Sequence, residues 1–228
     1  MAWRLSLTEP QTNADRRPIA TRERKASIAL ASAVARAGVS ANTISILGMV
    51  AGLGSGVVLA LTPTLGPAAA RGAFLAAAVL IQLRLLANML DGMVAVSTGQ
   101  ASPVGELYNE IPDRVSDAAT LIGLGYAAGG SPELGYVATC LAFLTAYIRA
   151  VGRGAGAGSD FRGPMAKPQR MFLCTVASLY VALAPAPWQP SFGRGWGVPA
   201  AALAVVALGS LVTCLRRLSG IAGKLSRA

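Results

Sequence analysis

Acidic and amide side chains gather in one short stretch of this otherwise apolar chain, NMLDGMVAVSTGQASPVGELYNEIPDRVSD, which covers residues 88–117. The stretch holds three aspartates, two glutamates and two asparagines, and the 228-residue sequence contains no histidine. Without histidine there are no imidazole bases, imidazole metal ligands or serine–histidine triads. Carboxylate and amide oxygens remain, and these suit Mg²⁺, Mn²⁺ or Ca²⁺. The stretch therefore predicts a site for a hard divalent cation.

The spacing of these residues places them on the faces of two helices. Asn88 and Asp91 are three residues apart and so share one helix face. A second set recurs every four residues on the next helix: Gly105, Asn109, Asp113 and Asp117. Ser102 and Pro103 are typical of a helix N-cap and first turn, so the segment STGQA is a short loop. We therefore expect two antiparallel neighbouring helices whose polar faces oppose each other.

The rest of the sequence predicts an all-α integral membrane protein. Hydrophobic residues make up 54% of the chain and charged residues 13%, and only helices or closed barrels satisfy the backbone in lipid. The apolar stretches are rich in alanine and leucine and lack strand alternation, which favours a helical bundle. Six segments approach the roughly 20 residues that cross a bilayer: 44–61, 70–96, 115–128, 134–150, 171–186 and 198–215.

The distribution of positive charge orients this six-helix bundle. The net charge is +10, and most basic residues lie before the first segment, after the fourth and after the sixth. Because basic residues are retained on the cytoplasmic side, both termini are expected in the cytoplasm, at the cytoplasmic membrane of a bacterium. The positive charge is then explained by attraction to anionic lipid headgroups, and no nucleic acid is expected as a partner.

The expected organisation has three parts. They are a cytoplasmic basic and amphipathic segment over 1–37, a membrane domain over 38–216 and a basic cytoplasmic tail over 217–228. Part of the first segment has two interpretations, an amphipathic helix on the membrane surface or a disordered tail up to Arg24.

An arginine inside the second segment is the first feature with an open interpretation. Arg84 lies one turn before Asn88 on the same face, where an ionisable group is costly and functional by default. In one interpretation Arg84 contacts an anionic substrate. In the other it is structural, either snorkelling to the membrane surface or paired with Asp91.

A stripe of small residues in the first segment is the second such feature. Gly48, Gly52 and Gly56 form two overlapping G-x-x-x-G patterns. Such patterns permit close helix packing, either within the bundle or between two copies of the chain.

At the acidic stretch the sequence resembles the CDP-alcohol phosphotransferase (phosphatidyltransferase) family, whose signature is D-x2-D-G-x2-A-R-x8-G-x3-D-x3-D. Every spacing of that signature is present, as NMLDGMVAV, eight further residues and GELYNEIPD. Residue identity departs at three positions, where Asn88 and Asn109 replace aspartate and Val96 replaces arginine. The segments SANTIS and GPMAKPQR are similar to two further family segments, so the resemblance covers about residues 38 to 215.

The resemblance implies an enzyme of phospholipid biosynthesis that displaces CMP from CDP-diacylglycerol, or a similar CDP-lipid, with a small alcohol acceptor. It implies one or two Mg²⁺ or Mn²⁺ ions at the diphosphate and Asp113 as the base for the attacking hydroxyl. The implied metal ligands are Asn88, Asp91, Asn109 and Asp113, with Asp117 one turn further as an additional ligand. The implied substrate contacts are Asn42, Ser45, Arg84, Gly92, Ala95, Gly105, Lys167 and Arg170. Family members are commonly homodimers, so a dimer is expected.

The two asparagines leave the charge of the metal site open, because an amide oxygen is a neutral and weaker ligand than a carboxylate. Three outcomes are consistent with the residues: two ions held with help from Asp117 or Glu110, one tightly held ion with a second that arrives with the CDP group, or an inactive site. The competing hypothesis is a non-catalytic homologue that acts as a membrane scaffold or a transporter. The acceptor is open among glycerol phosphate, serine, an inositol phosphate and a phospholipid.

Overall fold

Capped, alanine-rich and leucine-rich stretches give this chain its helices. The computed structural model describes residues 25–98 and 103–227, and of residues 103–109 the backbone alone. Ser40 caps the helix that begins at Ala41 by accepting a hydrogen bond from the Thr43 amide at 3.1 Å. Several later helices have proline in the first turn. Proline is tolerated there because a backbone amide in the first turn makes no hydrogen bond within the helix.

The described residues form seven α-helices and three short 3-10 helices. In chain order they are α1 (Lys25–Arg36), α2 (Ala41–Leu61), η3 (Thr62–Thr64), α3 (Pro67–Ser97), α4 (Pro103–Tyr126), α5 (Pro132–Gly154), α6 (Lys167–Leu183), η4 (Ala186–Trp188), η5 (Gly193–Gly195) and α7 (Val198–Leu225). Each segment predicted from hydropathy overlaps one helix from α2 to α7. Helix α4 begins at Pro103, as the helix-start pattern at Ser102 and Pro103 predicts and ahead of its hydropathy segment, and α7 continues beyond its segment to Leu225. Both extensions are rich in charged or polar residues, which end a hydropathy segment but not a helix.

Four of the described helical segments are long and apolar enough to cross a membrane, namely Ala41–Thr64, α3, α5 and α7. Helices α4 and α6 are not among these four, for different reasons. Helix α6 has only 17 residues, and α4 carries the charged residues of the predicted site along its length.

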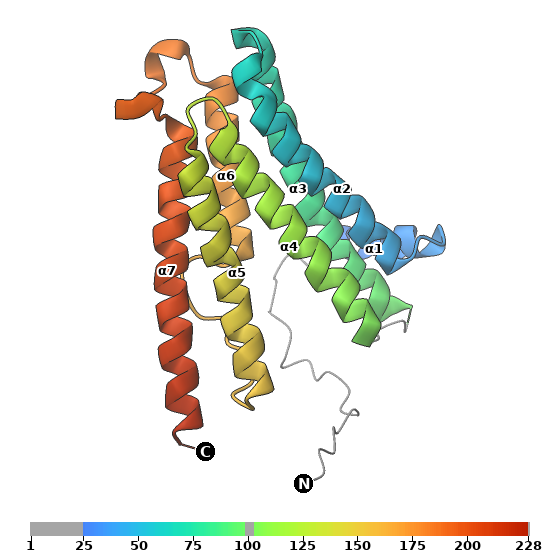
Figure 1. Cartoon of the computed structure of the whole chain (residues 1–228). Helices are drawn as coiled ribbons and strands as arrows, with labels where there is room; N and C mark the ends of the chain where they lie inside the picture. The colour runs from blue at the N-terminus through green and yellow to red at the C-terminus, as the bar shows by residue number, and fades with distance from the viewer. Residues whose placement is uncertain (1–24, 99–102, 228) are drawn as a thin grey trace.

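The long helices pack as a bundle in which α2 lies against α3 and α4, α3 against α6, and α5 against α4 and α7 (Figure 1). The largest core cluster includes Leu59, Phe74, Ile81, Leu124 and Leu203. Because α3 and α4 both pack on α2, their polar faces are held near each other, as the spacing of their residues predicts.

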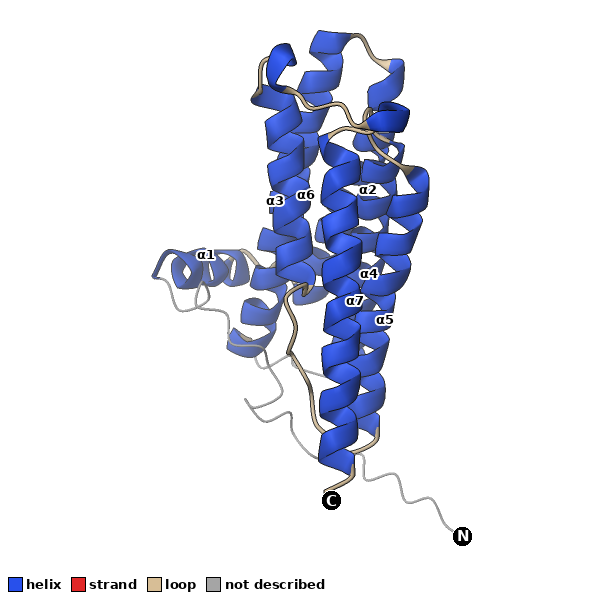
Figure 2. Ribbon diagram, turned by 90° about the vertical axis from the view of Figure 1, so that its left-hand side faces the viewer, coloured by secondary structure: helices blue, strands red, loops and turns tan. Residues whose placement is uncertain are grey.

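Helix α1 runs across the bundle rather than along it (Figure 2). Its Ala31 packs in a small cluster with Ile44 of α2 and with Leu90 and Val94 of α3. Ile28 and Leu30 of α1 are exposed. The amphipathic surface helix was expected over residues 16–38, of which residues 25–36 are helical, while residues 1–24 lie outside the described part. Its place on a membrane surface stays a prediction.

The glycine stripe of α2 is used inside the bundle. A Cβ atom on Gly48 would lie 2.7 Å from the Ala87 Cβ atom of α3, and one on Gly52 would lie 2.5 Å from the Ser116 Cβ atom of α4. A Cβ atom on Gly56 would overlap the backbone carbonyl of Ala119. The structure therefore assigns this stripe to packing of α2 on α3 and α4.

Gly56→Leu is therefore expected to destabilise the bundle strongly, by about 3 kcal/mol or more, because backbone rather than a movable side chain occupies the space. The matched control is Gly72→Leu, since Gly72 is helical and exposed with nothing near its missing side chain. Thermal unfolding in detergent should show a large loss of Tm for Gly56→Leu only. An equal Tm for both variants would contradict the packing described.

Candidate active site

Helix α3 brings three polar side chains to the face that meets α2 and α4. Arg84, Asn88 and Asp91 recur at helical spacing, and Arg84 and Asp91 are buried, 2% and 3% exposed. The Asp91 Oδ2 atom accepts a hydrogen bond from the Ser45 hydroxyl of α2 at 2.7 Å. Its Oδ1 atom accepts one from the Gly92 amide at 2.6 Å. These two bonds fix the Asp91 carboxylate against the start of α2.

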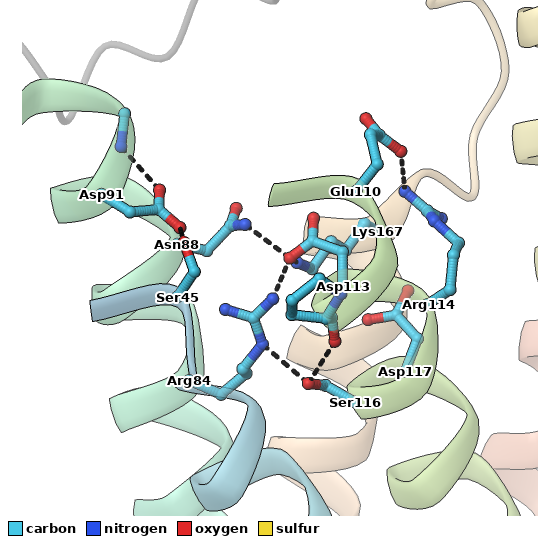
Figure 3. A network of polar contacts seen from close by, with 12 residues as sticks. Ser45, Arg84, Asn88, Asp91, Glu110, Asp113, Arg114, Ser116, Asp117 and Lys167 are labelled. Carbon is cyan, nitrogen blue, oxygen red and sulfur yellow. Dashed lines mark hydrogen bonds and ion pairs between the residues drawn. The ribbon is translucent and has the colours of Figure 1, made fainter. Parts of the chain in front are cut away.

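Helix α4 contributes Asp113, on which side chains from two other helices converge (Figure 3). The Asp113 Oδ1 atom is contacted by a terminal nitrogen of Arg84, and it accepts a hydrogen bond from the Asn88 amide at 2.6 Å. The Lys167 Nζ atom, at the start of α6, lies 2.6 Å from the same oxygen. All three contacts use Oδ1, and none of them uses Oδ2. Asp113 is thus the meeting point of α3, α4 and α6.

Arg84 connects α3 to α4 through two side chains. Besides contacting Asp113, its Nε atom donates to the Ser116 hydroxyl at 3.0 Å, and Ser116 donates to the Pro112 carbonyl at 2.6 Å. The Arg84 Nη1 atom is buried and has no hydrogen-bond partner among the described residues. Of the two interpretations of Arg84, the ion pair is present, but the partner is Asp113 rather than Asp91.

Asp117 and Arg170 form a second buried pair deeper in the bundle. The Arg170 Nη2 atom donates to the Asp117 Oδ2 atom at 2.9 Å, and the two side chains are 1% and 2% exposed. Arg170 also donates to the Met165 carbonyl at 3.2 Å. The Asp117 Oδ1 atom is buried without a partner in the described part of the chain. The pair ties α4 to the first turn of α6, which carries Lys167.

The remaining predicted site residues are less closely tied to this cluster. Asn42 is exposed in the first turn of α2, and Gly92 and Ala95 are partly exposed on the turn of α3 that follows Asp91. Gly105 and Asn109 lie in the first turns of α4, outside the residues whose side chains the structure describes. The contribution of Asn109 therefore stays a prediction.

Basic side chains from the C-terminal halves of α5 and α7 lie near the loop that connects α5 to α6. Arg149 lies 2.8 Å from Glu110 and stacks over the Phe161 ring at 5.7 Å from its centroid. Glu110 also holds Arg114 at 3.0 Å. In the loop between α5 and α6, hydrogen bonds from Arg162 lower the pKa of Asp160 below its ordinary value.

Two residues of this region were not predicted from the sequence. Arg217 is buried and donates to the Arg162 carbonyl at 3.0 Å and to the Thr145 carbonyl at 2.6 Å. The sequence does not distinguish Arg217 from its exposed neighbour Arg216. Ser116, which accepts a hydrogen bond from Arg84, could have been noticed because it lies three residues after Asp113 and so shares its face of α4.

The oxygen donors near Asp91 and Asp113 fit one divalent cation. No group of three or more acidic, cysteine or histidine side chains that could hold a metal occurs among the described residues. The available donors are the Asp91 carboxylate, the Asp113 Oδ2 atom and the amide oxygen of Asn88, which lies between the two carboxylates in Figure 3. Two carboxylates and an amide are a donor set that Mg²⁺ or Mn²⁺ accepts.

A sequence model of the CDP-alcohol phosphatidyltransferase family matches residues 38–215. The chain therefore belongs to this family of transferases, and it is an integral membrane protein with several apolar helices. Curated relatives include the phosphatidylinositol phosphate synthase of Mycobacteroides abscessus, 32% identical over 84% of this chain and 81% of the relative. The same-named enzyme of Streptomyces avermitilis is 30% identical over 80% of this chain and 72% of the relative.

Solved structures give the same fold. The phosphatidylinositol phosphate synthase of Mycobacterium tuberculosis with CDP-DAG bound is similar with a TM-score of 0.68, over 87% of this chain and 94% of that chain, at 21% identity. A structure of that enzyme in complex with manganese and citrate also has a TM-score of 0.68, over 86% of this chain and 88% of that chain, at 21% identity. At this identity the likeness establishes the shared fold alone.

Proposed function

We propose that the chain transfers the phosphatidyl group of CDP-diacylglycerol to an inositol phosphate and releases CMP. The observation that carries this proposal is the buried Asp91 and Asp113 cluster at the signature positions of a phosphatidyltransferase. Phosphoryl transfer needs positioning and neutralisation of charge more than covalent chemistry. Such a cluster suits it without any histidine. The inositol phosphate acceptor is suggested by the names of the relatives.

An apolar groove lies on the side of α3 that meets α6. The groove, of about 390 Å³, lies between α3 and α6 and is lined by Val79, Leu83 and Leu86 of α3 and by Thr175 and Leu179 of α6. Leu86 and Asn88 are two residues apart on α3 and project from different sides of that helix, so the groove reaches the level of the polar cluster on the side of α3 that meets α6. We propose that an acyl chain lies in this groove while the diphosphate lies at Asn88, Asp91 and Asp113.

The transfer step follows from these positions. The acceptor hydroxyl oxygen bonds to the phosphorus of the phosphatidyl group, and the bond from that phosphorus to the CMP oxygen breaks. The hydroxyl proton passes to the Asp113 carboxylate, which Arg84, Asn88 and Lys167 contact through its Oδ1 atom. A divalent cation held by Asn88, Asp91 and Asp113 would polarise the diphosphate and stabilise the leaving phosphate. Lys167 and Arg84 hold and orient Asp113.

The acceptor phosphate needs cations of its own, separate from those at the diphosphate. Lys167 and Arg170 were expected as substrate contacts, but Arg170 is buried against Asp117 and Lys167 is paired with Asp113. Arg149 and Arg162 are closer to the loop between α5 and α6 and are more exposed, at 27% and 56% of their side chains. We propose that this loop region receives the acceptor phosphate, while the Asp117–Arg170 pair positions α6.

The membrane arrangement is part of the proposal. We propose that α4 and α6 cross the membrane with the four more apolar segments, with both chain ends on the cytoplasmic side of a bacterial membrane. Helices α4 and α6 would bring polar side chains of the site to the cytoplasmic boundary. We further propose that the chain forms a homodimer, through a surface other than the glycine stripe, which is buried inside the bundle.

The proposed acceptor is tested with membranes from cells that produce the chain. The membranes receive CDP-diacylglycerol, Mn²⁺ and one acceptor at a time: an inositol phosphate, glycerol phosphate, serine or a phospholipid. Mass spectrometry of the lipids is expected to show phosphatidylinositol phosphate, absent from membranes of cells without the chain. A new lipid formed only from another acceptor would overturn the inositol assignment and keep the phosphatidyltransfer.

A further inference from the structure

The cluster around Asp113 contains as many cationic as anionic side chains. Arg84 and Lys167 both contact Asp113, and Asp91 is the second carboxylate. Asp117 and Arg170 cancel each other in their own buried pair. The described side chains of the site therefore carry no net charge, although the signature positions of the family imply an acidic site.

This neutrality limits how much metal the site can hold. One divalent ion would leave a surplus of two positive charges, which a diphosphate diester, with one negative charge on each phosphoryl group, balances. A second divalent ion would leave two further positive charges without a partner in a largely buried site. Uncompensated charge of that kind is costly to bury. The two asparagines that replace aspartates remove the carboxylates that would have offset it.

Arg84 also has hydrogen-bonding capacity that nothing uses in the described part of the chain. Its side chain is 2% exposed and its Nη1 atom is buried without a partner. In Figure 3 the side of the guanidinium away from Ser116 faces toward Ser45 and Asp91. The Nη1 atom packs close to Gly48 of α2, because a Cβ atom on Gly48 would lie 2.9 Å from it. A buried donor in this position lacks only an anionic acceptor.

We propose that the site works with a single divalent ion, and that Arg84 and Lys167 donate hydrogen bonds to the diphosphate where a second ion would otherwise contact it. The ion lies with Asn88, Asp91 and Asp113. Arg84 donates to a phosphoryl oxygen through Nη1 while its other nitrogens stay on Asp113 and Ser116. A guanidinium suits this role because it remains charged and offers several donors in a fixed plane. The proposal rests on the phosphatidyltransfer function proposed above.

The test counts bound Mn²⁺ by electron paramagnetic resonance on the purified chain, with CDP-diacylglycerol present and no acceptor, so that no turnover occurs. One Mn²⁺ per chain is expected. The comparison variant is Asn88→Asp with Asn109→Asp, which restores both carboxylates and is expected to bind two Mn²⁺. Two ions of similar affinity on the unaltered chain would overturn the proposal. One ion on both proteins would overturn its charge argument.

The role of the two cations is tested by donor binding. Arg84→Gln and Lys167→Gln are each expected to weaken calorimetric binding of CDP-diacylglycerol about tenfold or more, as for loss of a charge-assisted hydrogen bond. Arg84→Lys keeps the charge and should lose less than Arg84→Gln. If the Arg84 variants do not fold, Lys167→Gln carries the test. Unchanged affinity in Lys167→Gln and in any folded Arg84→Gln overturns the role of these cations. If the unaltered chain binds no CDP-diacylglycerol, the function fails as well.

Discussion

Replacing Asp113 by asparagine is expected to lower CMP release about a thousandfold, the scale on which a general base contributes. The amide keeps the size of the side chain and an oxygen for Arg84, Asn88 and Lys167, but it cannot accept the proton of the acceptor hydroxyl. The variant also leaves two cations without a carboxylate partner, so its Tm should fall while the protein remains folded. Release of CMP is measured well below that Tm.

The matched control is Glu133→Gln, the same change from carboxylate to amide in the first turn of α5. Glu133 interacts with Ser131 at that end of the bundle, so the control should retain its activity. Asp113→Asn with activity within about tenfold of the unaltered chain would contradict the assignment of the base.

Replacing Asp91 by asparagine is the second change with a large expected effect. Asp91 is one of the two described carboxylates of the proposed metal site, and Ser45 and Gly92 fix its orientation. Loss of this charge should weaken Mn²⁺ binding by roughly a hundredfold or more and suppress CMP release at ordinary Mn²⁺ concentrations. Raised Mn²⁺ should restore part of the activity, which distinguishes a ligand from a base.

Ser45→Ala provides the graded comparison for Asp91. Ser45 only orients the Asp91 carboxylate, so its loss should weaken Mn²⁺ binding roughly tenfold, the lower end of the range for outer ligand partners. Equal Mn²⁺ affinity in Asp91→Asn and the unaltered chain, measured by paramagnetic resonance, would exclude Asp91 as a ligand.

The helices and their order were predictable because apolar composition and turn residues mark them directly. Residue spacing also placed Asp91 and Asp113 on the facing sides of neighbouring helices, which the structure brings together around Asn88. These predictions depend only on local periodicity, which the sequence displays. The start of α4 at Pro103 was predicted by the capping pattern rather than by hydropathy. The end of α7 was less well predicted, because hydropathy decreases where charged residues begin although the helical hydrogen bonds continue.

The pairings across the bundle were not predictable from periodicity. Arg84 was expected against Asp91 or a substrate, and it contacts Asp113, because the rotation of α3 against α4 decides which carboxylate it meets. Arg170 and Asp117 are 53 residues apart, and no local signal connects them. The use of the glycine stripe likewise depended on the neighbours of α2, which only the assembled bundle specifies.

The most direct test of the account is CMP release by the purified chain with CDP-diacylglycerol, an inositol phosphate and Mn²⁺. We expect CMP and phosphatidylinositol phosphate to form in equal amounts, and both to stop when the metal is chelated. A folded chain that binds CDP-diacylglycerol and Mn²⁺ but releases no CMP with any of the four acceptors would contradict the account and favour a non-catalytic homologue.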